Sequence, residues 1–454
     1  MAFQDFAFQI NPVDVPPIET SFRKIASPIP CPGTRDLISR LERYESRSMH
    51  GQIPLVWERA SDFSIFDPAG NKFIDFTSAI FLANVGHANP RVVKAVTDIV
   101  QKPLIHAYNY PTDIRARYLE ELVVFTGHGM EKAFLLSAGT EATEAAMKLM
   151  RLHGLKEGKR RPLIISFKGN YHGRTMGAQM LSSNQQQKEW IGFQDSNVAY
   201  LDFPFPWVVD AGEERGFFRG SLDRLIREEG LDLSQDVCGF MLEVFQGWAA
   251  AFYPKDFVRE IKEVCDKHRI LLCFDEVQAG FARTGKAFGY EHYGVEADLL
   301  CCGKGIGSGI VLSAVIGRGE IMDLPPVGSM SSTHSANPIA CTAGLATLEE
   351  IRAKGLIKRA EASGKLLHTG LERLKYEYPE HITYVMGMGM IAALHFKSHL
   401  FASQVVERCF RKGLLTVFTG RESIKLGPPL TIPDEALLEG LEVMREAIRE
   451  TIAL

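Results

Sequence analysis

The chain has 454 residues, of which 46% are hydrophobic and 23% are charged, and its net charge at pH 7 is −4. This length exceeds the size at which a single hydrophobic core stops growing, so at least two domains are expected. The charge balance offers no basic surface for nucleic acid or for an anionic membrane.

Targeting segments, disulfides and metal motifs are not visible in the sequence. The first residues lack the basic and apolar regions of a secretory signal, and no apolar run approaches the roughly 20 residues of a membrane-spanning helix. The eight cysteines show no C-x-x-C spacing and lie mostly inside apolar runs, which is typical of reduced core residues. The histidines show no metal-ligand spacing. We therefore predict a cytoplasmic protein with no metal site and no membrane partner.

The N-terminal region, to about residue 55, is rich in proline and is predicted to form an arm over the body of the protein. Its apolar side chains favour an ordered arm, at a subunit interface, over a disordered tail; they are Phe3, Phe6, Phe8, Ile10 and Phe22. The turn signal at 67–71 lies between residues 57–66 and 72–76 and predicts a β-hairpin. A helix is expected over 91–101.

From residue 134 onward, short apolar runs alternate with helical patterns such as the amphipathic segment 255–268. The runs lie at 134–136, 163–167, 198–202, 239–243, 270–274, 299–302 and 311–316. This alternation predicts an α/β domain built on a largely parallel sheet. A helix over 339–353 leads to a smaller α+β unit, with helices near 358–375, 401–412 and 434–451 and strands at 385–390 and 423–426.

The segment 271–286 begins as an apolar strand and places Asp275 and Glu276 at its carboxyl end, where open α/β sheets bind their ligands. A second strand, 299–302, is followed by Lys304 between two glycines. Pyridoxal phosphate requires such a pair, an acid for its pyridine nitrogen and a lysine for the Schiff base. For Asp275 the alternatives are a carboxylate that caps a helix and the metal-holding strand of an NTPase; the latter would need a phosphate loop that the sequence lacks. For Lys304 the alternative is an ordinary surface lysine.

The segment 134–148 has the pattern strand, tight turn, helix. Its small turn residues would let backbone N–H groups point at an anion, and the helix N-terminus adds its positive dipole end. A plain helix N-cap, with Glu144 and Lys148 as an i, i+4 pair, is the alternative.

Together these segments resemble the class III (ornithine/4-aminobutyrate type) aminotransferases, which are pyridoxal-phosphate enzymes of fold type I. The resemblance runs from about residue 63 to the C-terminus. Its motifs are Ser-Ala-Gly-Thr-Glu-Ala at 137–142, Tyr-His-Gly-Arg-Thr at 171–175, Asp-Glu-Val-Gln-Ala-Gly-Phe-Ala-Arg-Thr-Gly at 275–285, Gly-Lys-Gly at 303–305 and Thr-His-Ser-Ala-Asn-Pro at 333–338.

The resemblance implies an α/β fold of type I, with a mostly parallel seven-stranded sheet in the large domain and a smaller α+β domain formed by the N- and C-terminal segments. We place the arm and part of the small domain at 1–88, the large cofactor domain at 89–345 and the C-terminal small domain at 346–454.

The activity that the resemblance implies moves an amino group from an amine or amino acid to a 2-oxo acid through a Lys304 aldimine. An amino-acid racemase or epimerase is the alternative, because segment 308–318 is similar to that of class III racemases. A decarboxylating enzyme and an inactive homologue are weaker alternatives.

The family's residue roles transfer to this sequence by motif. The catalytic residues would be Lys304, Asp275 and Glu243. Val277 would pack under the cofactor ring, Tyr171 would stack on its other face, and Gln278 would lie near its phenolic oxygen. Thr333 would reach the phosphate of the neighbouring subunit's cofactor, which implies a homodimer, or a tetramer, with shared active sites. The remaining cofactor-binding residues are Ala138, Gly139, Thr140 and His172.

Two positions depart from the family pattern. Trp248 replaces the second glutamate of the segment Glu-Pro-x-Gln-Gly-Glu-Gly-Gly, and Lys425 stands where many relatives carry an arginine before Pro-Pro. In glutamate-using relatives that glutamate and arginine form a carboxylate switch, and a lysine lacks the bidentate fork. We therefore expect the switch to be absent, with Lys425 as sole carboxylate anchor being the alternative. The candidate substrate pocket is aromatic and mostly apolar, which favours a hydrophobic or extended amine; its residues are Ile80, Phe81, Tyr108, Trp248 and Lys425.

Overall fold

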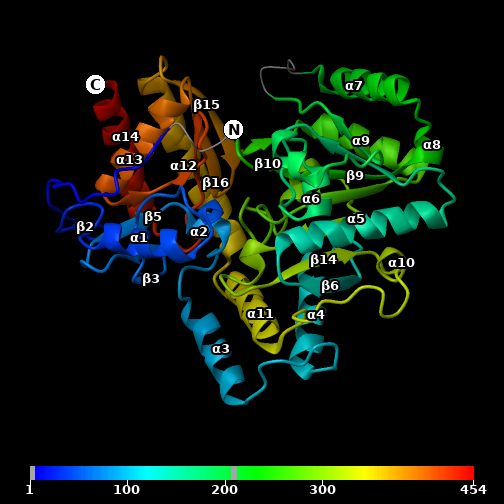
Figure 1. The fold of residues 1–454 in the computed structure, drawn as a ribbon, viewed down its shortest axis with the longest axis horizontal. Coiled ribbons are helices and arrows are strands. Elements are labelled where there is room, and N and C mark those ends of the chain that lie inside the picture. Colours follow the sequence, from blue (N-terminus) through cyan, green and yellow to red (C-terminus); the bar gives the residue numbers. More distant parts are fainter. Residues whose placement is uncertain (1–5, 206–211, 454) are drawn as a thin grey trace. The chain divides into compact units, whose positions relative to one another are not determined.

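The structure is a computed structural model that describes residues 6–205 and 212–453, and the chain divides into two compact units (Figure 1). The small unit comprises Met1–Asn89, Trp248–Ala250 and Lys358–Leu454, and the large unit comprises Pro90–Gly247 and Ala251–Ile357. Among the described residues no helix is both long and apolar enough to cross a membrane.

The large unit is built on a seven-stranded sheet, as the sequence predicts. Its strands follow the order β6 (Lys132–Leu136), β14 (Ser313–Gly317), β13 (Leu299–Cys302), β12 (Leu271–Asp275), β9 (Val237–Glu243), β7 (Leu163–Phe167) and β8 (Val198–Leu201). Only β14 runs antiparallel to its neighbours, β13 and β6. Each of the seven predicted apolar runs corresponds to one of these strands.

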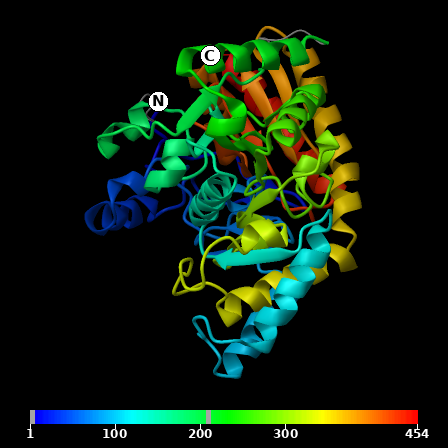
Figure 2. The same cartoon turned by 90° about the vertical axis from the view of Figure 1, so that its right-hand side faces the viewer.

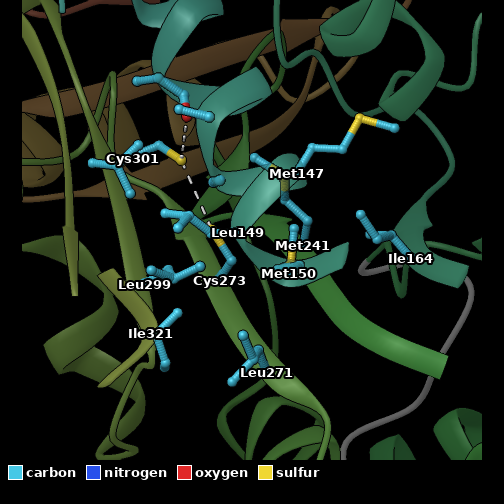
Figure 3. Close-up of a cluster of buried hydrophobic side chains, with 14 of the residues drawn as sticks. Met147, Leu149, Met150, Ile164, Met241, Leu271, Cys273, Leu299, Cys301 and Ile321 are labelled. Atoms are coloured by element: carbon cyan, nitrogen blue, oxygen red, sulfur yellow. Dashed lines mark hydrogen bonds between the residues drawn. The ribbon is translucent and has the colours of Figure 1, made fainter. Parts of the chain in front are cut away.

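Helices cover both faces of this sheet. On one face α5 (Gly139–Lys156) packs Met147 and Met150 against Met241, Cys273 and Cys301 (Figure 3). Cys273 Sγ lies 3.8 Å from Cys301 Sγ, and both side chains are fully buried.

The opposite face is covered by α7 (Glu214–Glu229) and α9 (Lys255–His268). There Phe240 of β9 contacts Phe218 of α7, which in turn packs on Phe257 of α9. Because successive strand side chains point to opposite faces, Phe240 packs into the layer of α7 and α9, whereas Met241 packs into the layer of α5.

The remaining elements of the large unit surround this core. Helix α11 (Pro338–Ala353) packs on both α3 (Pro90–Gln101) and α4 (Asp113–Thr126), as Figure 2 shows. These contacts keep α11 in the large unit, so the boundary predicted at 345/346 falls inside a helix, upstream of the division at Ile357. The short elements are α6 (Met176–Leu181), α8 (Leu233–Asp236), α10 (Gly319–Met322), β10 (Phe245–Gln246), β11 (Ala251–Phe252) and the 3-10 turns Gln186–Ile191, Gly289–Tyr293 and Lys304–Ile306.

The small unit contains two sheets. The first has the order β1 (Ile18–Glu19), β2 (Lys24–Ile25), β5 (Lys72–Asp75), β4 (Ser64–Phe66) and β3 (Arg59–Ser61), and β17 (Leu414–Leu415) pairs in parallel with β5. The second has the order β15 (Ile382–Met388), β16 (Ile391–Phe396), β19 (Ser423–Leu426) and β18 (Val417–Phe418). The pairing of β17 with β5 joins the N- and C-terminal segments in one α+β unit, which confirms the predicted composition of the smaller domain.

The helices of the small unit are α1 (Thr34–Tyr44), α2 (Ser78–Phe81), α12 (Leu356–Glu377), α13 (His399–Arg411) and α14 (Asp434–Ile452). Helix α12 begins at the boundary between the units, and a 3-10 turn lies at Arg47–Met49.

Two details of the N-terminal region differ from the sequence expectation. The segment 57–66 is not one strand, because the chain reverses at Asp62 (φ 53°) and β3 pairs with β4. The predicted turn at 67–71 then joins β4 to β5, and Asp67 Oδ1 accepts from Ala69 N and Asn71 N.

The predicted arm is ordered where the structure describes it. It includes the unpredicted helix α1, and Phe8 packs on Phe418 with 4.9 Å between ring centroids. Phe22 similarly lies 6.0 Å from Phe63. Phe3 lies outside the described residues.

Candidate active site

The candidate active site of the large unit contains two carboxylates at the carboxyl ends of neighbouring strands. Asp275 ends β12 and Glu243 ends β9, and the two residues are direct partners in the parallel register. Asp275 lies two residues after Cys273 in its strand, and Glu243 lies two residues after Met241. Since side chains two residues apart point to the same face of a sheet, both carboxylates point to the face that α5 covers. Both side chains are buried; Asp275 Oδ1 accepts from Val277 N at 3.0 Å and Glu243 Oε2 from Tyr171 N at 3.0 Å.

Buried His172 holds Asp275 from the side. His172 Nδ1 lies 2.8 Å from Asp275 Oδ2, while Nε2 lies 3.3 Å from Asn170 Nδ2 and 3.4 Å from Ser166 Oγ. Because an ionised carboxylate can only accept, Nδ1 carries the proton in this contact. The imidazole therefore fixes the orientation of the Asp275 carboxylate.

Lys304 follows β13 directly after Gly303. Its backbone occupies the left-handed region (φ 45°), which costs a non-glycine residue about 1–3 kcal/mol and is characteristic of functional sites. Burial lowers the pKa of the Lys304 amine, and the nearby Asp275 and Glu243 oppose that shift. The amine is thus held in the field of both strand-end carboxylates.

The three neighbouring carboxylates differ in character. Burial raises the pKa of Glu243 to about 7, with His172 opposing the shift, so a substantial fraction of this carboxyl is protonated near neutral pH. Burial also raises the pKa of Glu276 to about 8, but this carboxylate accepts from Gly289 N at 2.9 Å and from Tyr290 N at 2.7 Å. Glu276 therefore organises the following turn, while Asp275 and Glu243 face the α5 side of the sheet.

Two glycines keep the space beside these groups open. A Cβ on Gly139 would lie 3.0 Å from Val277 Cγ1, and one on Gly303 would lie 3.2 Å from the same atom and 3.4 Å from the Gly139 Cα. Three parts of the chain therefore come close together here: Gly139 in the turn before α5, Val277 after the two carboxylates, and Gly303 before Lys304. An amine, a carboxylate, an apolar valine and a helix N-terminus in one place fit the functional groups of pyridoxal phosphate.

The N-terminus of α5 supplies the anion-binding groups. Glu141 N and Ala142 N bond to Ala138 O, whereas among the described residues no acceptor binds the N–H groups of Gly139 and Thr140. Those two donors are suited to a phosphate.

The side chains around that turn are already ordered. Thr140 Oγ1 lies 2.7 Å from Thr175 Oγ1, while Glu144 Oε1 accepts from Gly177 N at 2.9 Å at the start of α6. The alternative of a Glu144–Lys148 pair is wrong, because Lys148 Nζ donates to Ser329 O at 2.7 Å.

The other predicted cofactor residues take varied positions. Tyr171 is 41% exposed and Arg174 lies over its ring, so one face of the phenol is open to a stacking partner. A Cβ on Gly247 would approach both Gln278 Nε2 and Glu243 Oε1, which places these two side chains together. Ala138 is exposed at the anion-binding turn, and exposed Thr333 lies between α10 and α11.

In the small unit, candidate residues Ile80 and Phe81 belong to an unusual turn. All four residues of α2, Ser78–Phe81, have φ between 49° and 69°, which is a left-handed conformation without glycine. Thr77 Oγ1 accepts from Ala79 N at 3.0 Å, and Ser78 Oγ donates to Gly427 O at 2.6 Å. These contacts offset the strain and fix the two side chains, with Phe81 buried and Ile80 exposed.

Phe81 and Lys425 meet in the same unit. Lys425 Nζ lies 4.6 Å from the Phe81 ring centroid, and a Cβ on Gly427 would lie 2.0 Å from Phe81 Cε1. Lys425 is 4% exposed, so its ammonium is removed from bulk water.

Trp248 lies at the tip between β10 and β11, five positions after Glu243 in the chain. Ser423 Oγ donates to Trp248 O at 3.1 Å, and the indole ring lies 5.9 Å from His395. Tyr108 belongs to the large unit instead, in the loop between α3 and α4, and is 38% exposed.

Sequence reasoning missed two residues of this region. Arg421 lies over the Trp248 ring with 4.5 Å from its guanidinium carbon to the centroid, and Gly427 provides room for Phe81. A glycine just before Pro-Pro was a readable signal for close packing. Nothing in the sequence indicated the Arg421–Trp248 contact.

Metal ligands are not assembled in the part of the chain that the structure describes: no group of three or more His, Cys, Asp or Glu side chains is placed to hold a metal ion.

Known proteins resemble this chain over nearly its whole length. The acetylornithine aminotransferase of Synechocystis sp. is 31% identical over 405 residues, covering 88% of this chain and 90% of that protein. The leucine/methionine racemase of Thermococcus litoralis is 33% identical over 430 residues, covering 91% of this chain and 95% of that protein.

Solved structures share the fold. The ornithine aminotransferase of Toxoplasma gondii matches with a TM-score of 0.82 at 24% identity, covering 92% of this chain and 96% of that chain. An amine transaminase from an uncultivated Pseudomonas species, in its PLP-bound form, matches with a TM-score of 0.79 at 26% identity, covering 90% and 96%.

The family model described as aminotransferase class III matches residues 46–448. That match includes every candidate cofactor and substrate residue discussed above. The chain belongs to the class III aminotransferases, which are pyridoxal-phosphate-dependent enzymes of fold type I.

Proposed function

We propose that Lys304 holds pyridoxal phosphate and moves the proton at the substrate Cα during transamination between an amine or amino acid and a 2-oxo acid. The observation that carries this proposal is the desolvated Lys304 amine in the field of Asp275 and Glu243. Because burial lowers the pKa of that amine, a larger fraction is neutral at a given pH and can accept a proton.

When bound, pyridoxal phosphate supplies the electron sink that allows the Cα–H bond to break. Asp275 would hold a proton on the pyridine nitrogen, and His172 would keep that carboxylate in position through its 2.8 Å hydrogen bond. Because burial raises the pKa of Glu243 to about 7, this carboxyl carries less negative charge beside Asp275 near neutral pH than an exposed glutamate would.

The phosphate would lie at the N-terminus of α5, on the N–H groups of Gly139 and Thr140 and the Thr140 hydroxyl. Val277 and Tyr171 would enclose the ring, and Ala138, Gln278 and Thr333 would complete the cofactor site. Exposure of Thr333 supports a role toward a second copy of the chain, in a homodimer or a tetramer built from it. The eight cysteines are free and buried, which supports a cytoplasmic enzyme.

The substrate side would involve Ile80, Phe81, Tyr108, Trp248 and Lys425, whose apolar and aromatic character favours a hydrophobic or extended amine. Because Trp248 replaces the glutamate of the family's carboxylate switch, 2-oxoglutarate need not be the preferred acceptor. A wide kinetic preference for 2-oxoglutarate over pyruvate would contradict the absence of the switch.

The role of Lys304 is tested by reduction of the holoenzyme with borohydride and mass spectrometry of its peptides. We expect pyridoxal phosphate to be fixed on the peptide that contains Lys304. The Lys304→Ala variant should lose this label, and its turnover should fall by about 10²- to 10⁴-fold. The matched control Lys286→Ala removes an exposed lysine and should keep both. Labelling of a different lysine in the wild-type enzyme would refute the assignment.

Racemisation is the second candidate, supported by the 33% identity to the leucine/methionine racemase of Thermococcus litoralis. It would return the proton to the opposite face of Cα and would need no 2-oxo acid. Loss of optical rotation from L-leucine or L-methionine without any added acceptor would establish it.

A further inference from the structure

The backbone of His172 is held by two side-chain hydroxyls. His172 lies between β7 and α6, outside any helix or strand. Its N–H donates to Ser182 Oγ at 3.0 Å, and its carbonyl oxygen accepts from Thr143 Oγ1 at 2.8 Å. Among the residues that the structure describes, no backbone group bonds to either of these atoms. The orientation of His172 therefore depends on Thr143 and Ser182.

Both hydroxyls are buried, and each is also anchored on a helix. Ser182 follows α6 directly, and its Oγ donates to Ala178 O at 3.2 Å. Thr143 lies in α5 and is fully buried, and its Oγ1 lies 2.9 Å from Thr140 O. Because a hydroxyl has one proton, Thr143 shares that proton between the carbonyls of Thr140 and His172.

Thr143 thus connects two parts of the candidate active site. Thr140 carries one of the two N–H groups that we propose for the phosphate, and His172 Nδ1 lies 2.8 Å from Asp275 Oδ2. A buried carbonyl that loses its donor is unfavourable, so without the Thr143 hydroxyl the peptide of His172 would turn toward another donor. That movement would take the imidazole away from Asp275.

Other buried threonines of the large unit show how Thr143 differs. Thr126 Oγ1 donates to Leu122 O in α4, and Thr347 Oγ1 donates to Ala343 O in α11, each at 2.8 Å. Both contacts join residues four apart in one helix, which is common for threonine. The Thr143 hydroxyl reaches a carbonyl 29 positions further along the chain, so it joins separate segments.

We propose that Thr143 and Ser182 are positioning residues, which hold the backbone of His172 so that its imidazole keeps the Asp275 carboxylate oriented for the pyridine nitrogen. Thr143 also ties this arrangement to the phosphate turn at Thr140. This inference rests on the proposed function. All five residues belong to the large unit, and they act on the part of the cofactor that every substrate shares.

The first test is the kinetics of purified holoenzyme with the donor that the wild-type enzyme uses best. Thr143→Val removes the hydroxyl at nearly constant volume and should lower kcat about 10-fold, and so should Ser182→Ala. KM should change by less than about 2-fold, because the lost interaction does not bind substrate. Thr143→Ser keeps the hydroxyl and should restore the wild-type kcat.

A double-mutant cycle separates positioning from a general structural role. If Thr143 acts through His172, then Thr143→Val should lower kcat no further in a protein that already carries His172→Gln. A threonine that only supported the fold would lower kcat by the same factor in both backgrounds.

The cofactor-free protein gives a readout that does not depend on turnover. With 15N-labelled histidine, NMR should show an Nδ1 proton of His172 that exchanges slowly with water, and His172→Gln should remove that signal. Exchange should be about 10-fold faster in Thr143→Val, because the hydrogen bond to Asp275 opens more often. The matched control Thr347→Val removes an equally buried hydroxyl and should change neither kcat nor this exchange.

Three results would overturn the proposal. They are equal losses of kcat for Thr143→Val with and without His172→Gln, an unchanged exchange rate in Thr143→Val, and a failure of Thr143→Ser to restore activity. Each leaves the Lys304 assignment intact, because borohydride labelling tests that residue separately.

Discussion

The candidate cofactor residues of the large unit and the candidate substrate residues of the small unit are assembled in different ways. Asp275 and Glu243 are partners in adjacent parallel strands, and Lys304 follows the next strand of the same sheet. In the small unit, Phe81 comes from a left-handed turn, and Lys425 meets it from a strand far along the chain. The first arrangement is fixed by sheet geometry, and the second by individual side-chain contacts.

This difference has a functional meaning. The strand ends of the large unit present the groups that we propose to hold the cofactor, so changes there should affect all substrates equally. The small-unit cluster of Phe81, Trp248, His395, Arg421 and Lys425 depends on close packing and can vary without altering the sheet. Changes there should affect the choice of substrate. Three further variants test this division, beginning with the largest expected effect.

Asp275→Asn should lower kcat by about 10³-fold for every amine and amino acid tested. The amide keeps the shape of the side chain but cannot carry the negative charge that we propose would hold a proton on the pyridine nitrogen. Steady-state kinetics with leucine and with 3-methylbutylamine, the amine that leucine would give on losing its carboxylate, measure the effect. Asp223→Asn, an exposed change on α7, is the control. A loss confined to amino acids would break the proposed division between the units.

Glu243→Gln should change how stability depends on pH. The folded pKa of Glu243 is about 7 and its ordinary value is 4.5, so between these values the native state binds a proton that the unfolded state has lost. Wild-type stability should therefore fall by about 3 kcal/mol as pH rises across that interval, relative to the variant.

Guanidinium unfolding of both proteins at several pH values measures this difference. Any pH-independent effect of the substitution on the free energy of unfolding shifts the whole curve of the variant and does not change how its stability varies with pH. Parallel stability profiles for the two proteins would show that the Glu243 carboxyl ionises in the fold as it does in water.

Gly427→Ala should destabilise the protein by about 2 kcal/mol, because its Cβ would lie 2.0 Å from Phe81 Cε1 and the ring must move. It should also alter the ratio of kcat/KM values among amines of different side chain while leaving borohydride labelling of Lys304 intact. Gly216→Ala, where no atom lies within 4 Å of the new Cβ, should cost no stability. Equal unfolding midpoints for the two variants would contradict a packing role for Gly427.

Much of the large unit could be predicted because its pattern is local. The alternation of apolar runs and helical segments predicted all seven strands, and the position of Asp275 at a strand end followed from the boundary of one such run. The β3–β4 reversal at Asp62 was missed because an aspartate can adopt a positive φ without the glycine that usually marks it. The helix α1 was missed because the surrounding prolines suggested an irregular arm.

The sequence by itself determined the family and with it the cofactor, and it placed the candidate residues Asp275, Glu243 and Lys304 at the ends of neighbouring parallel strands, which meet at one edge of the sheet. Only the tertiary structure decided how these groups are tuned and which aromatic ring Arg421 packs against. The His172–Asp275 hydrogen bond, the burial that raises the pKa of Glu243 to about 7, and the stacking of Arg421 on Trp248 all join residues distant in the chain. Their physical basis is desolvation and contact geometry, which depend on the surroundings of a side chain in space and have no period in the sequence.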